Sequence, residues 1–123
     1  MELNKLTERI IGASIDVHKA LGPGLLENVY KQCLHYKLQK EGIFVEKEKN
    51  LPVVFEGVTI DCGYKIDLLV EEKVVIELKS VSEFNNIHTA QMLTYLKLGK
   101  YDLGLLINFN VDQLIKGVKR LRN

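Results

Sequence analysis

The sequence has few cysteines, little net charge and no long apolar run, and these shortages exclude several classes of protein. Cys33 and Cys62 are too few and too far apart for a disulfide framework, and neither belongs to the CxxC pair of a zinc site. We expect both to be small core residues. No apolar run approaches the roughly 18 residues that cross a bilayer. The N-terminal stretch MELNKLTERI lacks the apolar core of a signal peptide, so we expect a cytoplasmic protein that does not contact membranes.

The formal net charge is only +1, so the strongly basic balance that signals a nucleic-acid-binding domain directly is missing. This low charge does not exclude such a partner, but it requires any basic surface to be local. The candidate basic residues are Lys97, Lys100, Lys116, Lys119, Arg120 and Arg122. A solvated face is the commoner explanation for such groups of charges.

The chain of 123 residues has no repeat or linker, and we expect one domain across residues 1–123. Apolar residues recur every three or four positions from Leu3 to Ala20, which predicts a helix that ends at Gly22-Pro23. A second helix is expected from about Leu25 to Glu41. The residues predicted for its buried face are Leu26, Val29 or Tyr30, Cys33 and Tyr36.

The apolar pattern then changes to one typical of strands. Strands are expected at residues 43–45, 51–55, 58–60, 64–70, 74–80 and 103–109, with a helix at about 86–98. The tail from Asp112 fits an edge strand nearly as well as a helix, because Gly117 weakens a helix. This order of elements predicts an α/β sandwich with a central mixed sheet flanked by helices.

Three charged residues interrupt the two apolar strands predicted within the segment IDLLVEEKVVIELKSV. Glu77 and Lys79 are two positions apart on a predicted strand, so their side chains share one face. Asp67 lies on the preceding strand. A three-residue connection through Glu71–Lys73 would place Asp67 opposite Glu77, with Cβ atoms about 5 Å apart. A two-residue loop would place them on opposite faces unless a bulge intervened.

Two carboxylates this close in a partly dry site need a proton or a cation between them. Magnesium prefers oxygen ligands, keeps several waters, and can activate water beside a phosphate. Lys79 would add a fixed positive charge that holds a water or a phosphate oxygen. The three residues together predict a metal-dependent phosphodiesterase site. The competing interpretation is a buried structural ion pair of Lys79 with Glu77 or Asp67.

Three further residues are candidates for the same site. Gln91 and Tyr95 are four positions apart and therefore share a helix face, from which they could contact a nucleotide. A polar helix surface beside a core tyrosine is the alternative. Glu27 falls in the first turn of the second predicted helix, where the helix dipole alone also favours a carboxylate.

Five segments of the chain resemble one known family. The stretch Gly24–Tyr30 matches the pattern of the GxxExxY proteins, and the segments GYKIDLLV, VVIELKSV, AQMLTYLKL and GLLINF are similar to that family in order and spacing. The resemblance covers nearly the whole chain. This family is assigned to the PD-(D/E)XK nuclease superfamily, which implies a restriction-endonuclease-like core.

The resemblance also implies roles for individual residues. It implies that Asp67 and Glu77 are metal ligands, that Lys79 is catalytic, and that Glu27 matches the acidic residue of the first core helix. The two remaining candidates, Gln91 and Tyr95, would match the QxxxY motif of RecB-like nucleases. The proline of the PD signature is absent, since Ile66 precedes Asp67.

Two functions from different classes follow from these observations. The first is a nuclease that hydrolyses the phosphodiester bonds of DNA with Mg²⁺, or with Mn²⁺ in its place. A homodimer would suit cleavage of two strands, by analogy with other small nucleases. The second is a module that keeps the nuclease fold and binds nucleic acid or a partner protein without cleaving.

Overall fold

The computed structural model describes residues 1–123 and contains three α-helices, one short 3-10 helix and seven strands. The elements in chain order are α1 (Leu3–Leu21), α2 (Glu27–Lys40), β1 (Val45–Asn50), β2 (Val53–Phe55), β3 (Val58–Ile60), β4 (Lys65–Val70), β5 (Val74–Lys79), α3 (Asn86–Gly99), β6 (Leu103–Asn108), η1 (Leu114–Gly117) and β7 (Val118–Arg122). None of the helices is both long enough and apolar enough to cross a membrane.

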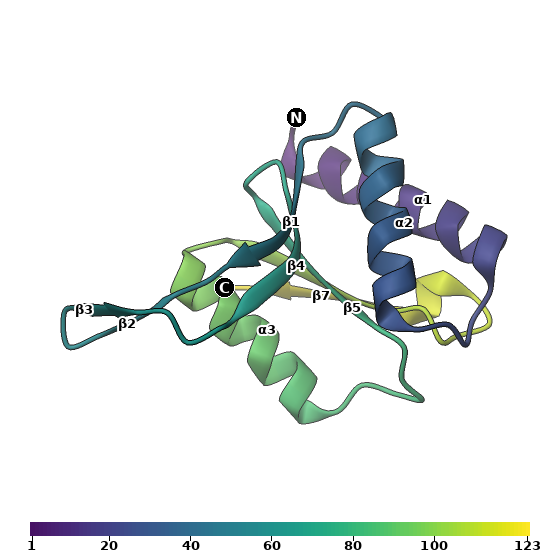
Figure 1. Ribbon diagram of the computed structural model, residues 1–123. Helices are drawn as coiled ribbons and strands as arrows, with labels where there is room; N and C mark the ends of the chain where they lie inside the picture. Colours follow the sequence, from purple (N-terminus) through teal and green to yellow (C-terminus); the bar gives the residue numbers. More distant parts are fainter.

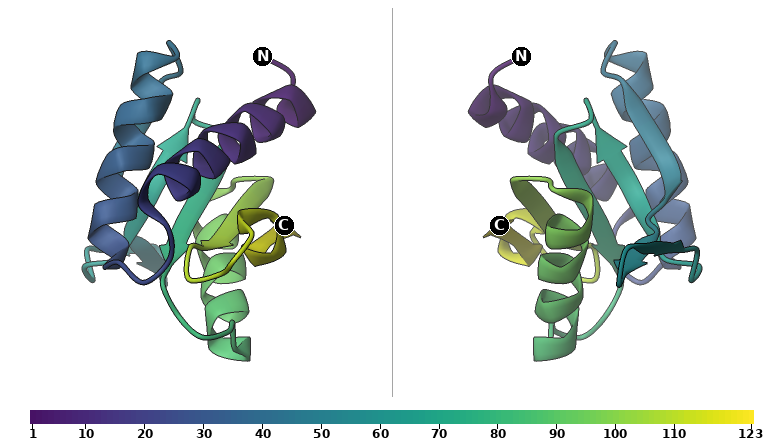
Figure 2. Two further views of the ribbon diagram at one scale, coloured as in Figure 1. Left: turned by 90° about the vertical axis from the view of Figure 1, so that its right-hand side faces the viewer. Right: turned by 90° about the vertical axis from the view of Figure 1, so that its left-hand side faces the viewer.

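Five strands form one sheet between two layers of helices. The strand order is β1-β4-β5-β6-β7, and only the β5–β6 pair is parallel. Helices α1 and α2 cover one face of the sheet and α3 covers the other (Figures 1 and 2). The expected α/β sandwich with a central mixed sheet is therefore confirmed.

The two faces of the sheet carry separate apolar clusters. The larger cluster packs α1 and α2 against the sheet through residues such as Leu68, Ile76 and Leu78. The smaller cluster packs α3 against the other face through Met92, Tyr95 and Leu96, together with Val75 and Leu106 of the strands. The central strands β5 and β6 are buried on both sides, which accounts for their continuous apolar runs.

The buried face of α2 differs from the sequence prediction. The helix begins at Glu27, and its buried residues are Tyr30, Leu34 and Leu38, spaced four apart. Leu26 and Tyr36, which we predicted to be buried, are 77% and 65% exposed. The stripe is rotated because Tyr30 anchors the helix: its ring stacks on Phe109 at 4.4 Å and its hydroxyl donates to the Gly22 carbonyl at 2.6 Å.

The prediction for residues 43–55 placed the first strand too early and began the second two residues too soon, although β2 lies within the predicted range 51–55. Strand β1 contains the charged stretch Glu46–Lys49, whereas Leu51 and Pro52 lie between β1 and β2. A strand at the edge of a sheet tolerates charged residues, because one of its sides faces water. The β2–β3 hairpin projects from the body of the molecule (Figure 1), and Cys62 beyond it is exposed rather than buried.

Candidate active site

The turn between β4 and β5 decides which residues face each other across the two strands. Val70 pairs with Val74, so the connection has three residues, and the ladder continues to the pair Leu68–Ile76. Beyond this pair, the side-chain carboxylates of Asp67 and Glu77, instead of backbone carbonyls, accept hydrogen bonds from the N–H groups of the opposite strand. Glu77 Oε1 accepts a hydrogen bond from the Asp67 N–H at 3.1 Å, and Asp67 Oδ2 accepts one from the Leu78 N–H at 2.9 Å. Asp67 and Glu77 are thus interlocked at one end of the sheet.

Asp67 lies where the alternation of β4 breaks. Strand residues two apart normally share a face, yet Ile66 packs in the cluster under α3 while Leu68 packs in the cluster under α1 and α2. On the neighbouring strand β1, Glu48 has a left-handed φ of 56°, which is uncommon outside glycine. The kink in both strands separates β4 from the regular β5 ladder and makes room for carboxylates there.

Glu77 is the most strongly perturbed acid in the chain. Glu77 is only 6% exposed. Burial, followed by the negative charge of Asp67, raises the pKa of Glu77 to about 9. At neutral pH the metal-free site therefore keeps a proton on Glu77. Such a group accepts a cation in place of the proton.

Lys79 forms neither of the ion pairs that the structural interpretation requires. Its amine makes no ion pair or hydrogen bond, although its positive charge lowers the pKa of Glu77 weakly from further away. The cation nearest Asp67 is instead Lys31 of α2, whose Nζ lies 4.0 Å from Asp67 Oδ1 and 3.2 Å from Glu48 Oε1. A buried Lys79 ion pair with either carboxylate is therefore absent.

Sequence reasoning missed Lys31. Its side chain is only 14% exposed, which is unusual for a lysine. The available signal was its spacing, because Lys31 follows Glu27 by four residues and so occupies the same face of α2. Nothing in the sequence indicated that this face would lie over β4.

Gln91 and Tyr95 face the same end of the sheet from α3. Gln91 Nε2 donates to the Tyr95 hydroxyl at 2.9 Å. Burial, followed by the negative charge of Glu77, raises the pKa of Tyr95, so the phenol lies within the electrostatic reach of that carboxylate. The start of α3 is fixed by a capping box between Asn85 and His88, so His88 serves the helix end.

Glu27 lies near the site but not beside the two carboxylates. Its Oε2 accepts a hydrogen bond from the Ser80 N–H at 3.4 Å, one residue beyond Lys79. The Ser80 hydroxyl donates to the Leu25 carbonyl at 2.7 Å, which ties the start of α2 to the end of β5. No three His, Cys, Asp or Glu side chains in the chain are clustered as metal ligands. Glu27 therefore stands at the rim of the site.

The donor set fits one hard divalent cation. Asp67 Oδ1 accepts no hydrogen bond, and its nearest positive charge is the Lys31 amine at 4.0 Å. Magnesium is commonly held by one or two carboxylates and completes its shell with water. Asp67 and Glu77 could hold such an ion together, and the negative charge that raises the pKa of Glu77 would favour it.

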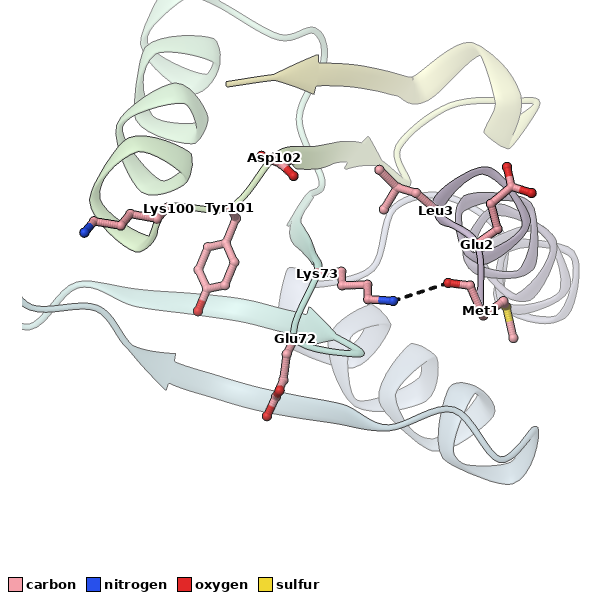
Figure 3. A pocket seen from close by; sticks show the side chains of 8 residues that line it. All are labelled: Met1, Glu2, Leu3, Glu72, Lys73, Lys100, Tyr101 and Asp102. Carbon is pink, nitrogen blue, oxygen red and sulfur yellow. Dashed lines mark hydrogen bonds between the residues drawn. The ribbon is translucent and has the colours of Figure 1, made fainter.

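The largest cavity of the molecule lies elsewhere. It encloses about 370 Å³ and is lined by the N-terminal residues, by Glu72 and Lys73 of the β4–β5 turn, and by the segment before β6 (Figure 3). Lys73 Nζ donates there to the Met1 carbonyl at 3.4 Å (Figure 3). This is the end of β5 opposite to Glu77 and Lys79, so the cavity and the carboxylates are separate features.

One comparison with known proteins gives a match. A family model described as PD-(D/E)XK nuclease superfamily matches residues 4–121. No curated protein and no solved structure is similar enough to the chain to match. The superfamily expected from the sequence motifs is confirmed, while placement among the GxxExxY proteins stays a prediction.

Proposed function

Because the chain belongs to the PD-(D/E)XK nuclease superfamily, we propose that it is a magnesium-dependent nuclease that hydrolyses phosphodiester bonds of DNA. The observation that carries this proposal is the interlocked pair of Asp67 and Glu77, in which a buried carboxyl keeps a raised pKa at the end of a central strand. A structural role alone would not require two acids to contact each other there. Binding of a cation beside an anionic substrate would explain why both acids are placed there.

Each residue of the site has a distinct part in the proposed reaction. Asp67 and Glu77 would hold the metal, which when bound supplies positive charge to a phosphate oxygen and acidity to a water. The unpaired amine of Lys79 would orient the attacking water. The water oxygen would form the new bond to phosphorus as the ester bond breaks, and the leaving oxygen would take up a proton from solvent to match the one that the attacking water loses.

The remaining candidates would act from the rim. Tyr95, held by Gln91, would position a phosphate or sugar of the bound strand. Glu27 would fix the end of β5 through Ser80 and so support Lys79. Manganese would replace magnesium at such an oxygen-rich site.

The test is incubation of the protein with labelled single-stranded, duplex and branched DNA, in magnesium and in chelator. We expect cleavage with magnesium, none with chelator, and none from Glu77→Gln. A wild-type protein that cleaves none of these substrates in magnesium or manganese would contradict the proposal.

The low net charge favours a second candidate, a module that holds nucleic acid or a partner protein without cleaving it. This alternative predicts binding of DNA that is independent of magnesium and unaffected by Glu77→Gln. The same incubation, combined with a binding assay in chelator, separates the two functions.

A further inference from the structure

A groove of about 250 Å³ lies on the α3 side of the sheet, and Tyr95 is one of the residues that line it. Six residues line it: Tyr64, Ile87, Ala90, Gln91, Thr94 and Tyr95. Tyr64 comes from the segment between the β2–β3 hairpin and β4, and the other five come from α3. Tyr95 thus belongs both to this groove and to the surroundings of Glu77.

The lining combines flat apolar surface with a few polar groups. The Tyr64 ring is 42% exposed and lies 5.8 Å from the Tyr95 ring, tilted by 58°. Ile87 is 72% exposed and adds apolar surface at the start of α3. Gln91 uses an N–H to hold the Tyr95 hydroxyl, so its carbonyl oxygen stays free to accept a hydrogen bond.

We propose that this groove holds one unpaired base of single-stranded DNA, stacked on Tyr64 and contacted at its edge by Gln91. The inference rests on the proposed function and deepens it by naming the substrate class. Aromatic rings take bases of any sequence, because every base has a π-face. The free amide oxygen of Gln91 would accept from a base N–H or amino group.

The size and the position of the groove favour this occupant. The groove of about 250 Å³ is smaller than the roughly 300–1,000 Å³ of sites for drug-sized ligands, which favours a single ring over a larger ligand. Tyr95 lines the groove and also feels the charge of Glu77, so a strand with a base on Tyr64 would run past Tyr95 toward the two carboxylates. A paired base inside a duplex is stacked on its neighbours and cannot enter, so the enzyme would act on unpaired strands.

The test measures binding of a short labelled single strand by fluorescence anisotropy in chelator, where no cleavage occurs. Tyr64→Ala should weaken binding roughly tenfold, as expected for one lost base–aromatic stack. Tyr64→Phe keeps the ring and should bind like the wild type. Tyr36→Ala is the matched control, because Tyr36 is a 65% exposed tyrosine on the α1–α2 side of the molecule. Thermal unfolding checks that each variant is folded.

A strand of the same length without bases separates stacking from phosphate contacts. Wild type and Tyr64→Ala should bind it equally. Equal binding of the normal strand by wild type and Tyr64→Ala would overturn the inference, and cleavage of DNA by the wild type would then leave the proposed function standing. Tighter, Tyr64-dependent binding of RNA would overturn the choice of DNA. A wild type that neither binds nor cleaves any strand would overturn both proposals.

Discussion

Glu77 is an acid placed where burial favours only its neutral form. The sequence left two arrangements of Asp67 and Glu77 open, and they differ only in the length of the turn between the strands. The structure has the three-residue turn, which places Asp67 opposite Glu77. The hydrogen bonds that interlock the two side chains could not be predicted from the sequence. These hydrogen bonds depend on the kink at Asp67 and Glu48, and the residue types at these positions do not predict a kink.

Replacing Glu77 by Gln should stabilise the metal-free protein increasingly as pH rises. The unfolded state releases the Glu77 proton near pH 4.5 and the folded state near pH 9, so the wild type loses stability between these values. The groups that face the Glu77 carboxyl are Asp67, Tyr95 and the more distant Lys79. Asp67 raises the pKa of Glu77 and Lys79 lowers it. Gln keeps the neutral shape at every pH.

Denaturant unfolding at roughly pH 5 and pH 8, in chelator, measures this effect. We expect the variant to gain at least about 1 kcal/mol relative to wild type between the two pH values, which is roughly 4 °C in a domain of this size. A constant difference across this range would show that Glu77 is ionised in the folded protein.

Replacing Lys79 by Met should abolish DNA cleavage and leave magnesium binding and stability nearly unchanged. The amine has no ion-pair partner, so its removal strands no buried charge. Loss of one partner of a buried ion pair would instead cost about 3–5 kcal/mol. Cleavage rates, calorimetric magnesium titration and denaturant unfolding of the same variant distinguish the two cases.

Regular elements account for most of what the sequence predicted correctly. The helices α1 and α3 were found near their predicted bounds, because their apolar residues recur regularly and Gly22 and Gly99 mark their ends. The strands β4, β5 and β6 were found there because each is a short continuous apolar run. Strand β1 was misplaced because its charged residues carry no apolar period. The buried face of α2 depends on Tyr30 stacking over Phe109, which is a contact distant in sequence.

Helix α2 brings Lys31 to the candidate site, and Lys31→Met should strengthen magnesium binding. The variant removes a competing positive charge 4.0 Å from Asp67 Oδ1. It also removes the pair with the exposed Glu48, so metal-free stability should fall only slightly. Lys37→Met is the control, since Lys37 lies on the same helix and pairs with Asp16 and Glu41. Weaker magnesium binding by Lys31→Met would mean that Lys31 supports the metal site.

Helix α3 approaches the sheet closely over Gly104 of β6. A Cβ at Gly104 would lie 2.4 Å from Met92 Sδ, so Gly104→Ala should displace α3 and destabilise the protein by about 1–3 kcal/mol. Gly12→Ala is the control, because no atom lies within 4 Å of a Cβ there, and removing a helical glycine should stabilise α1 by up to about 1 kcal/mol. Equal stability of the two variants in urea would show that α3 moves away from Gly104 with no loss of free energy of unfolding.

At the scale of the whole molecule, two helical layers and the sheet meet at one end around a single acidic pair. Helix α2 contributes Lys31 and Glu27, α3 contributes Gln91 and Tyr95, and β4 and β5 contribute the carboxylates and Lys79. Membership of the superfamily follows from the sequence as a whole, which matches over residues 4–121. That α2, the sheet and α3 all contribute residues to the end of the sheet at Asp67 could be seen only in the structure.

Calorimetric titration of magnesium into the metal-free protein tests most directly whether the acidic pair is a metal site. We predict that the wild type binds the ion at one site, that Lys79→Met binds it similarly, and that Asp67→Asn does not. Asp67→Asn should also be as stable as the wild type in chelator, because the amide oxygen can still accept from the Leu78 N–H and the neutral Glu77 carboxyl does not need the Asp67 charge. A wild type that takes up no magnesium, together with a strongly destabilised Asp67→Asn, would contradict the account and assign the pair a structural role.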